Sequence, residues 1–168
     1  MHVRPATPDD AAAITDIYNQ AVRATTASFD IEPKSVEERL AWLADRAPRH
    51  PVIVAEDEST VAGWGALSRY SERPAYDATV EISVYVDAAW HRRGVGRLLT
   101  DALLDRASST GVHSVIARIC TENAASVSLC KEAGFAEAGV MHEVGWKFER
   151  WLDVATYEYI VREAAHTR

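Results

Sequence analysis

Apolar and polar residues alternate through residues 80–86, and the spacing changes to that of a helix from residue 95 onward. The alternation has the period of two that is typical of a β-strand. From residue 95 the apolar residues recur at intervals of three and four, which predicts an amphipathic helix with one buried face. Gly111 follows this helix, at the position where a left-handed residue commonly ends one. We therefore predict a strand, a short loop over 91–94 and a helix in direct succession.

The same two periods predict the other elements. Ser35 and Glu38 form an S-x-x-E capping box, so a helix should begin there, with an apolar face made of Leu40, Leu43 and Ala47. Further helices are predicted to begin near Pro8 and near Asn123, and strands are predicted over 2–4, 51–56, 61–68, 114–119, 136–143 and 151–160. Strands and helices mixed in one small core indicate the α/β class, or α+β by some conventions.

Composition excludes several classes of protein. The 168 residues are enough for one domain spanning 1–168 and too few for two ordinary ones. A net charge of −7 argues against a nucleic-acid partner, and no apolar run is long enough for a membrane span. The N-terminus lacks the apolar core of a signal peptide, and Cys120 and Cys130 have no metal-type spacing. We expect a cytoplasmic protein with free thiols and no metal.

The loop between the predicted strand and helix has the properties of an anion-binding site. Its sequence, from residue 91 to 97, is H-R-R-G-V-G-R. The first amides of a helix lack internal acceptors and lie at the positive end of its dipole, so they favour phosphate. Gly94 and Gly96 leave the backbone open, and three arginines add charge. The alternative interpretation is an ordinary strand-to-helix turn with solvated arginines.

The segment H-R-R-G-V-G resembles the acyl-CoA signature R/Q-x-x-G-x-G/A of the GNAT superfamily of N-acetyltransferases. Further segments are similar to its phosphinothricin/methionine sulfoximine N-acetyltransferase group, in the family's order and over nearly the whole chain. These segments are residues 17–30, 32–39, 79–86, 123–126, 133–135 and 145–153. The resemblance implies a single GNAT-like domain, with a mixed, mostly antiparallel sheet flanked by helices and splayed at an acetyl-CoA site.

Glu81 is the candidate catalytic base. It matches the glutamate of the family's T-V-E segment, and a central strand covered on both faces would partly desolvate its carboxylate. The alternative interpretation is a glutamate on a solvated face or one paired with an arginine.

The resemblance also implies the residues that contact acetyl-CoA. They are Val84, Tyr85 and Val86 through their backbone, Arg92, Arg93, Gly94, Val95, Gly96 and Arg97 in the loop, and Asn123 and Ser126 on the pantetheine arm. Two positions depart from the family pattern. His91 replaces the usual Arg or Gln, which makes one phosphate contact depend on pH. Cys130 stands where many members have a proton-donating tyrosine, and we interpret it as a buried apolar side chain, with solvent as the alternative donor.

Phe29, Arg73 and Tyr76 correspond to segments that line the acceptor pocket in this group. Arg73 is the candidate for an acceptor carboxylate, with Arg69 as the alternative. We expect an acetyl-CoA-dependent transfer to the α-amine of a small amino acid analogue by direct attack, a homodimer, and resistance to such analogues as a side activity. The alternatives are the same fold acting on an aminoglycoside, polyamine or protein N-terminus, or a non-catalytic acyl-CoA-binding module. Lys147 and Trp151 are expected to fix the last two strands or a dimer contact.

Overall fold

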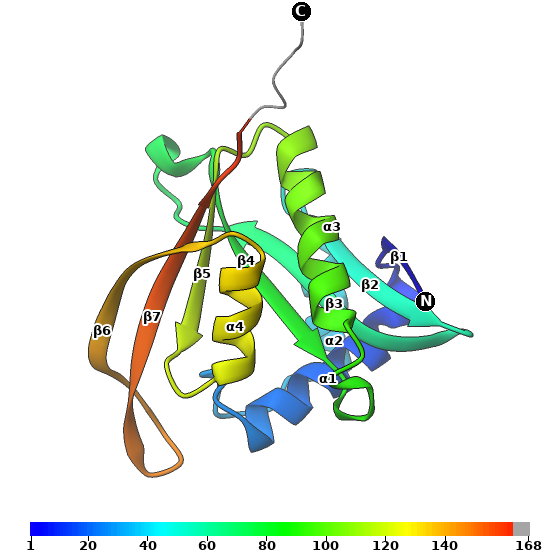
Figure 1. Ribbon diagram of the computed structural model, residues 1–168. Coiled ribbons are helices and arrows are strands. Elements are labelled where there is room, and N and C mark those ends of the chain that lie inside the picture. Colours follow the sequence, from blue (N-terminus) through cyan, green and yellow to red (C-terminus); the bar gives the residue numbers. More distant parts are fainter. Residues whose placement is uncertain (163–168) are drawn as a thin grey trace, which may run out of the picture.

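The computed structural model describes residues 1–162, which form one mixed sheet of seven strands covered by helices (Figure 1). The strand order is β1-β2-β3-β4-β5-β7-β6, and every neighbouring pair is antiparallel except β4 and β5, which are parallel. The strands are β1 (His2–Pro5), β2 (Val52–Asp57), β3 (Thr60–Arg69), β4 (Thr79–Val86), β5 (Ser114–Cys120), β6 (Ala136–Lys147) and β7 (Arg150–Ile160). The predicted α/β class and mixed sheet are confirmed.

Four α-helices cover the two faces of this sheet. They are α1 (Ala11–Ala24), α2 (Val36–Ala44), α3 (Val95–Ser109) and α4 (Ala124–Glu132), with short 3₁₀ turns η1 (Pro8–Asp10), η2 (Pro74–Tyr76) and η3 (Ala88–Trp90). In Figure 1, α3 and α4 lie in front of the sheet and α1 and α2 lie behind it. Within residues 1–162, no helix combines the length and apolar character needed to cross a bilayer. The expected helix starts at Ser35 and Asn123 are confirmed, since both side chains accept a hydrogen bond from the first turn.

Alternating side chains of the inner strands build two separate cores. In β2, Ile53 and Ala55 pack in the core that contains α3, whereas Val52 and Val54 pack in the core that contains α1. Successive side chains of a strand point to opposite faces, so a strand that is apolar at every position must be covered on both sides. The central strands are therefore buried between two helical layers.

β4 and β5 stay together for a short distance before they diverge. Their parallel ladder contains three residue pairs, which join residues 79–81 to residues 114–116. Beyond Glu81, β4 keeps its antiparallel ladder with β3 as far as Val86, while its other edge has no ladder partner among the described residues. In Figure 1 the two strands separate toward the lower end of the sheet. The predicted splay is present.

The predicted apolar face of α2 is wrong at two of its three residues, while the third, Leu43, packs against the core around α1. Leu40 is 40% exposed and Ala47 lies beyond the helix, whereas Arg39, at 7%, is the one buried residue of this helix. The guanidinium of Arg39 stacks over the rings of Trp42 and Trp64, which replaces the expected aliphatic packing with cation–π contacts. The strand predicted over 136–143 is also too short, since β6 continues to Lys147.

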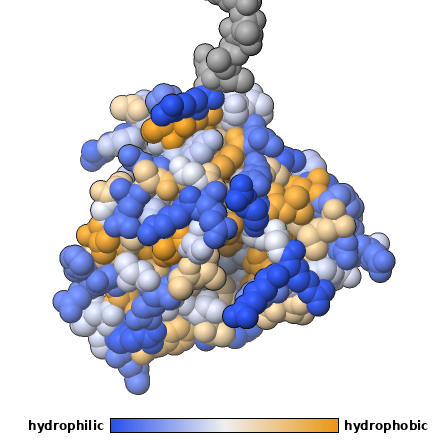
Figure 2. Space-filling model, in the orientation of Figure 1, coloured by the Kyte–Doolittle hydropathy of each residue, from blue (hydrophilic) through white to orange (hydrophobic). Residues whose placement is uncertain are grey.

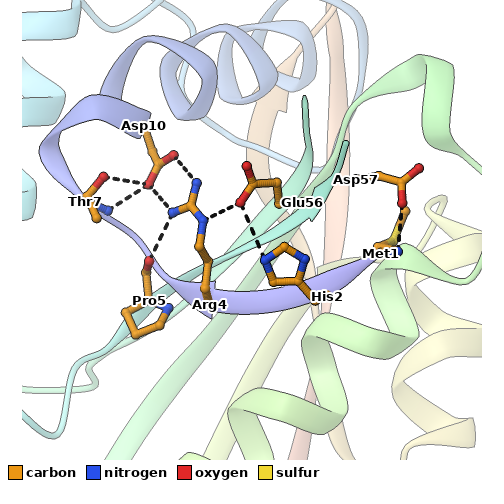
Figure 3. A network of polar contacts seen from close by, with 8 residues as sticks. All are labelled: Met1, His2, Arg4, Pro5, Thr7, Asp10, Glu56 and Asp57. Atoms are coloured by element: carbon orange, nitrogen blue, oxygen red, sulfur yellow. Dashed lines mark hydrogen bonds and ion pairs between the residues drawn. The ribbon is translucent and has the colours of Figure 1, made fainter. Parts of the chain in front are cut away.

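A polar network ties the first strand to its neighbours (Figure 3). The guanidinium of Arg4 donates to both carboxylate oxygens of Asp10, at 2.8 and 2.9 Å, and to Glu56 in β2. The Asp10 carboxylate also accepts from the backbone N–H of Thr7 at 2.7 Å. These contacts, with Arg4 the largest cause, hold the pKa of Asp10 below its usual range. β1 is thereby fixed to β2 and to the start of α1 by charged groups as well as by its ladder.

Candidate active site

A cleft of about 500 Å³ opens where β4 and β5 diverge. Its walls include Glu81, Ser83 and Tyr85 from one face of the sheet and Leu129 and Cys130 of α4 from the other. Residues 26–30, in the loop after α1, close one side. The cleft therefore passes through the sheet at its splayed edge, so a ligand there could contact both helical layers and the free edge of β4.

The carboxylate of Glu81 faces Arg118 of β5 across the cleft. Arg118 donates from Nε to one carboxylate oxygen at 2.9 Å and from Nη2 to the other at 2.6 Å. Both side chains line the cleft, and this pair raises the pKa of Arg118. The bidentate contact fixes the plane of the carboxylate and leaves its outer lone pairs free for a proton or a water. Glu81 therefore lines the cleft and is also paired with an arginine, as the alternative interpretation expected.

Two tyrosines separate the cleft from the core around α1. Tyr18 of α1 stands edge-on to Tyr85, with 5.1 Å between ring centroids. Its hydroxyl donates to Asp30 at 2.6 Å and lies 2.9 Å from the hydroxyl of Ser28. Burial, assisted by Asp30, raises the pKa of Tyr18 to about 12. Both phenols therefore stay neutral at ordinary pH and can act as hydrogen-bond donors.

Lys147 holds the loop that closes the cleft. This residue of β6 is 5% exposed, and its ammonium donates to the carbonyls of Thr25 at 2.9 Å and Ser28 at 2.5 Å. Burial lowers the pKa of this ammonium. The ring of Phe29 lies against the backbone of Gly145, so a side chain at residue 145 would force the ring to move. Lys147 was expected to fix the last two strands or a dimer contact. In the structure it attaches the loop after α1 to β6.

The glycine-containing loop leads from β4 into α3 as predicted. Gly94 adopts a φ of +79° and caps α3, and buried Val95 anchors the first turn. Arg93 stacks on Trp90 and Arg97 pairs with Asp101, so nearby residues hold the side chains of these two arginines in place. Arg92 is exposed, with a left-handed φ of +60°.

The start of α3 lies against the wall of the cleft. A side chain at Gly96 would come within 3.2 Å of Leu129, which lines the cleft. The His91 ring nitrogen Nε2 lies 3.0 Å from the carbonyl oxygen of Val86, at the end of β4. The loop residues 91–97 are thus adjacent to the cleft without lining it.

The remaining predicted cofactor residues lie at the α4 end of the cleft. Asn123 and Ser126 both line it, and the Asn123 side chain accepts from the backbone N–H of Ser126 at 3.2 Å. Val84 and Tyr85 line it too, whereas Val86 packs beside α3. Cys130 is buried, and burial raises the pKa of its thiol to about 12, which agrees with an apolar packing role. Both cysteines are free thiols.

The predicted acceptor residues are not brought together. Phe29 lines the cleft, while Arg73 caps the short turn η2 and is exposed. Tyr76 stacks on Tyr70 with 5.3 Å between ring centroids, and Arg69 pairs with Glu72. Arg69, Arg73 and Tyr76 do not line the cleft.

Three polar residues of this region escape sequence reasoning. Tyr18 is part of the apolar stripe expected for the first helix, and only the role of its hydroxyl was missed, whereas Arg118 and Arg39 were not singled out by the pattern at all. A signal for Arg118 exists, because the predicted strand over 114–119 carries this one arginine, but the sequence does not show that this strand lies beside the Glu81 strand. Arg39 gives no such signal, because its burial depends on three aromatic rings from separate elements. Over residues 1–162, His, Cys, Asp and Glu form no group of three suited to a metal.

Comparisons with known proteins agree with this geometry. The family profile described as an acetyltransferase (GNAT) domain matches residues 3–156. The chain is 38% identical to a phosphinothricin N-acetyltransferase of Streptomyces coelicolor, over 94% of this chain and 95% of that protein. It is 38% identical to the L-methionine sulfoximine/L-methionine sulfone acetyltransferase of Salmonella typhimurium, over 98% and 97%. A Salmonella typhimurium acetyltransferase solved with its cofactor acetyl-CoA superposes with a TM-score of 0.94 at 37% identity, over 100% of this chain and 98% of that one. The chain belongs to the GNAT family of N-acetyltransferases.

Proposed function

We propose that this enzyme transfers the acetyl group of acetyl-CoA to the α-amine of a small amino acid analogue of the phosphinothricin, methionine sulfoximine or methionine sulfone type. The names of the two relatives at 38% identity support this acceptor class. The observation that carries the proposal is the free edge of β4 beyond Glu81, which lies inside a cleft that also contains this glutamate. Residues 1–168 are proposed to act as one domain.

The residues present fit an acyl-CoA. An unpaired strand edge can accept an extended chain through backbone hydrogen bonds, and the pantetheine arm has amides that match such an edge. Val84, Tyr85 and Val86 would supply this edge, with Asn123 and Ser126 at the opposite wall. The amides at the start of α3, together with the arginines of the loop, would hold the pyrophosphate. The bound cofactor supplies an activated acetyl thioester.

Glu81 is proposed to accept the proton that the amine loses, directly or through a water molecule. Arg118 keeps its carboxylate oriented toward the cleft through the bidentate contact. A main-chain amide of the unpaired part of β4 would donate to the oxygen that gains negative charge during transfer. Because burial raises the pKa of the Cys130 thiol, we assign protonation of the departing thiolate to solvent.

The acceptor contacts and the assembly state stay predictions. Phe29 is in place to contact an acceptor, while Arg73 and Tyr76 would have to reach it from the loop before β4. A homodimer is proposed through the edge strand β6, its neighbour β7 and the turn between them, where large apolar side chains are exposed. These are Val140, Met141, Val144, Trp146, Phe148 and Trp151.

The test is release of free thiol from acetyl-CoA by purified protein, with phosphinothricin, methionine sulfoximine, methionine sulfone and ordinary amino acids as acceptors. Turnover should be fastest with the analogues, and Glu81→Gln should lower kcat by at least ~100-fold, the scale of a general base. Glu122→Gln is the matched control, because Glu122 also pairs with an arginine, Arg150 at 2.6 Å, but outside the cleft.

Each outcome separates one part of the proposal from another. Turnover that Glu81→Gln leaves unchanged would remove Glu81 as the base and keep the function. A preference for aminoglycosides, polyamines or peptide N-termini would replace the acceptor class. Binding of CoA without turnover of any amine would indicate a non-catalytic module. Accumulation of acetylated protein in the absence of an acceptor would exclude direct attack.

A further inference from the structure

A second hollow, of about 390 Å³, adjoins the cleft on the α2 side of the sheet. It lies between α2 and the strands β3 and β4, and its walls include Arg39, Trp42 and Trp64. Four residues line both cavities: Tyr18, Asp30, Ser83 and Tyr85. A ligand that reaches the cleft can therefore extend into this hollow past Ser83.

Arg39 enters this hollow as a buried cation without a partner. The residue is 7% exposed, its Nε atom is buried without a hydrogen-bond partner, and its guanidinium makes no hydrogen bond or ion pair with residues 1–162. The guanidinium is held by the rings of Tyr18, Trp42 and Trp64, with 4.6 to 5.1 Å to their centroids. Buried charged groups are ordinarily paired, so this one points to a ligand.

The acids nearest to Arg39 are already engaged. Asp30 accepts from the Tyr18 hydroxyl at 2.6 Å and lies 3.6 Å from the ammonium of Lys34. Glu38 accepts from the backbone N–H of Ser35 in the capping box of α2. Burial lowers the pKa of Arg39, although the charges of Asp30 and Glu38 act in the opposite direction. The guanidinium of Arg39 therefore still lacks an oxygen acceptor inside the hollow.

The spacing suits the side chain of a small amino acid. Arg39 stacks on Trp64, and Trp64 is the ladder partner of Tyr85. Tyr85 lies two residues, about 7 Å, from Ser83 along β4, and both residues line the two cavities where these meet. An acceptor with its amine near Ser83 and an oxygen-bearing group three or four bonds away would place that group near the guanidinium.

We propose that Arg39 binds the terminal phosphinate, sulfoximine or sulfone oxygens of the acceptor side chain and thereby selects oxygen-bearing acceptors over apolar ones. A guanidinium presents a planar fork of donors that matches two oxygens on one tetrahedral atom. The aromatic rings keep this fork in place and exclude water, which strengthens the contact. The inference rests on the proposed function and assigns its specificity to a residue of α2.

The test compares acceptors that differ at the end of the side chain. Phosphinothricin, methionine sulfone and norleucine are assayed with the wild type, Arg39→Met and Arg39→Lys. Arg39→Met should lower kcat/KM at least tenfold for the two oxygen-bearing acceptors and leave norleucine and the KM of acetyl-CoA nearly unchanged. Arg39→Lys keeps the positive charge but not the forked donors, so its kcat/KM for the oxygen-bearing acceptors should fall less. This variant also provides the test if Arg39→Met does not fold.

Arg46→Met is the matched control. The Arg46 guanidinium stacks on the same Trp42, at 4.4 Å, but it donates to the carbonyls of His50 and Leu67 and does not line the hollow. This variant should lose stability without changing the order of preference among acceptors. An equal loss for all three acceptors in Arg39→Met, or an unchanged preference, would overturn the inference.

A binding assay separates this inference from the proposed function. Dimethylphosphinate carries the terminal group without an amine, and its binding should change the fluorescence of Trp42 and Trp64 in the wild type and not in Arg39→Met. If the wild type acetylates none of the acceptors but shows this response, the function fails and the anion site stands. If the wild type turns over phosphinothricin but shows no response to dimethylphosphinate, the anion site fails.

Discussion

Arg4 and Arg39 show how differently one residue type can be used in the same small molecule. Arg4 has two carboxylate partners and joins β1 to β2 and to the start of α1 (Figure 3). Arg39 contacts three aromatic rings and pairs with no carboxylate of residues 1–162, and it faces a hollow. A paired charge stabilises the fold, whereas an unpaired buried charge costs stability and is retained where it has another use.

Asp10→Asn should destabilise the protein in a manner that depends on pH. Asp10 is 6% exposed and its pKa is lowered in the folded state by Arg4, so its contribution is present above the unfolded pKa of about 4 and is lost as the pH falls through the folded pKa. Urea unfolding should show a loss of about 1–3 kcal/mol at pH 7 that shrinks below pH ~4.

Asp9→Asn is the control for this measurement. Asp9 precedes Asp10 in the same turn and is exposed, with no described ion pair or hydrogen bond, so its substitution should change the free energy of unfolding by less than ~0.5 kcal/mol. A loss for Asp10→Asn that stays the same at pH 7 and pH 3 would show that the charge of Asp10 is not the cause.

The elements of the fold meet through few but specific side chains, and the loop after α1 is the clearest case. Residues 25–30 have no helix or strand of their own, yet they form a wall of the cleft. Their position is set by Lys147 at the end of β6, 119 residues away in sequence from Ser28. A loop of this kind is ordered by its contacts rather than by its own backbone bonds.

Lys147→Met should loosen the wall of the cleft. The substitution leaves the carbonyls of Thr25 and Ser28 without their donor, so it should cost about 1–3 kcal/mol of stability and speed amide hydrogen exchange in residues 26–30. The KM values should rise more than kcat falls. Lys131→Met, at an exposed lysine of α4, should change neither exchange nor KM. Unchanged exchange in the loop of Lys147→Met would contradict this role.

At the scale of the whole molecule, the surface is uneven in hydropathy. Figure 2 shows one face on which hydrophilic residues are interspersed with patches of hydrophobic ones. The exposed apolar residues of β6 and β7 include a pair of tryptophans, Trp146 and Trp151, with 5.0 Å between ring centroids. Exposed aromatic residues of this kind are enriched in protein interfaces.

Trp151→Glu should convert the proposed homodimer into a monomer, because a carboxylate would be buried without a partner at the interface. Sedimentation velocity at several protein concentrations gives the mass of the wild type and of the variant. Leu40→Glu, at an exposed leucine of α2, should leave the mass of the wild type unchanged. A monomeric wild type at all concentrations would refute the dimer.

Local patterns in the sequence determine most of the elements. The alternation in 80–86, the capping residues Ser35 and Asn123, and Gly111 at a φ of +73° all act within a few residues, so they can be recognised in the sequence. The strand-loop-helix unit at the centre and the mixed sheet follow from them and from the family resemblance. The candidate base Glu81 could be named for the same reason.

Tertiary structure alone decided which polar side chains meet. The partner of Glu81 became Arg118 because β4 and β5 run in parallel and then diverge, and Arg39 became buried because α1, α2 and β3 each bring one ring to it. The sequence pattern singled out neither arginine, and it expected Leu40 to be buried instead. Side-chain periodicity reports which face of an element is apolar, but a charged residue on the other face is buried or exposed according to the elements that pack over it.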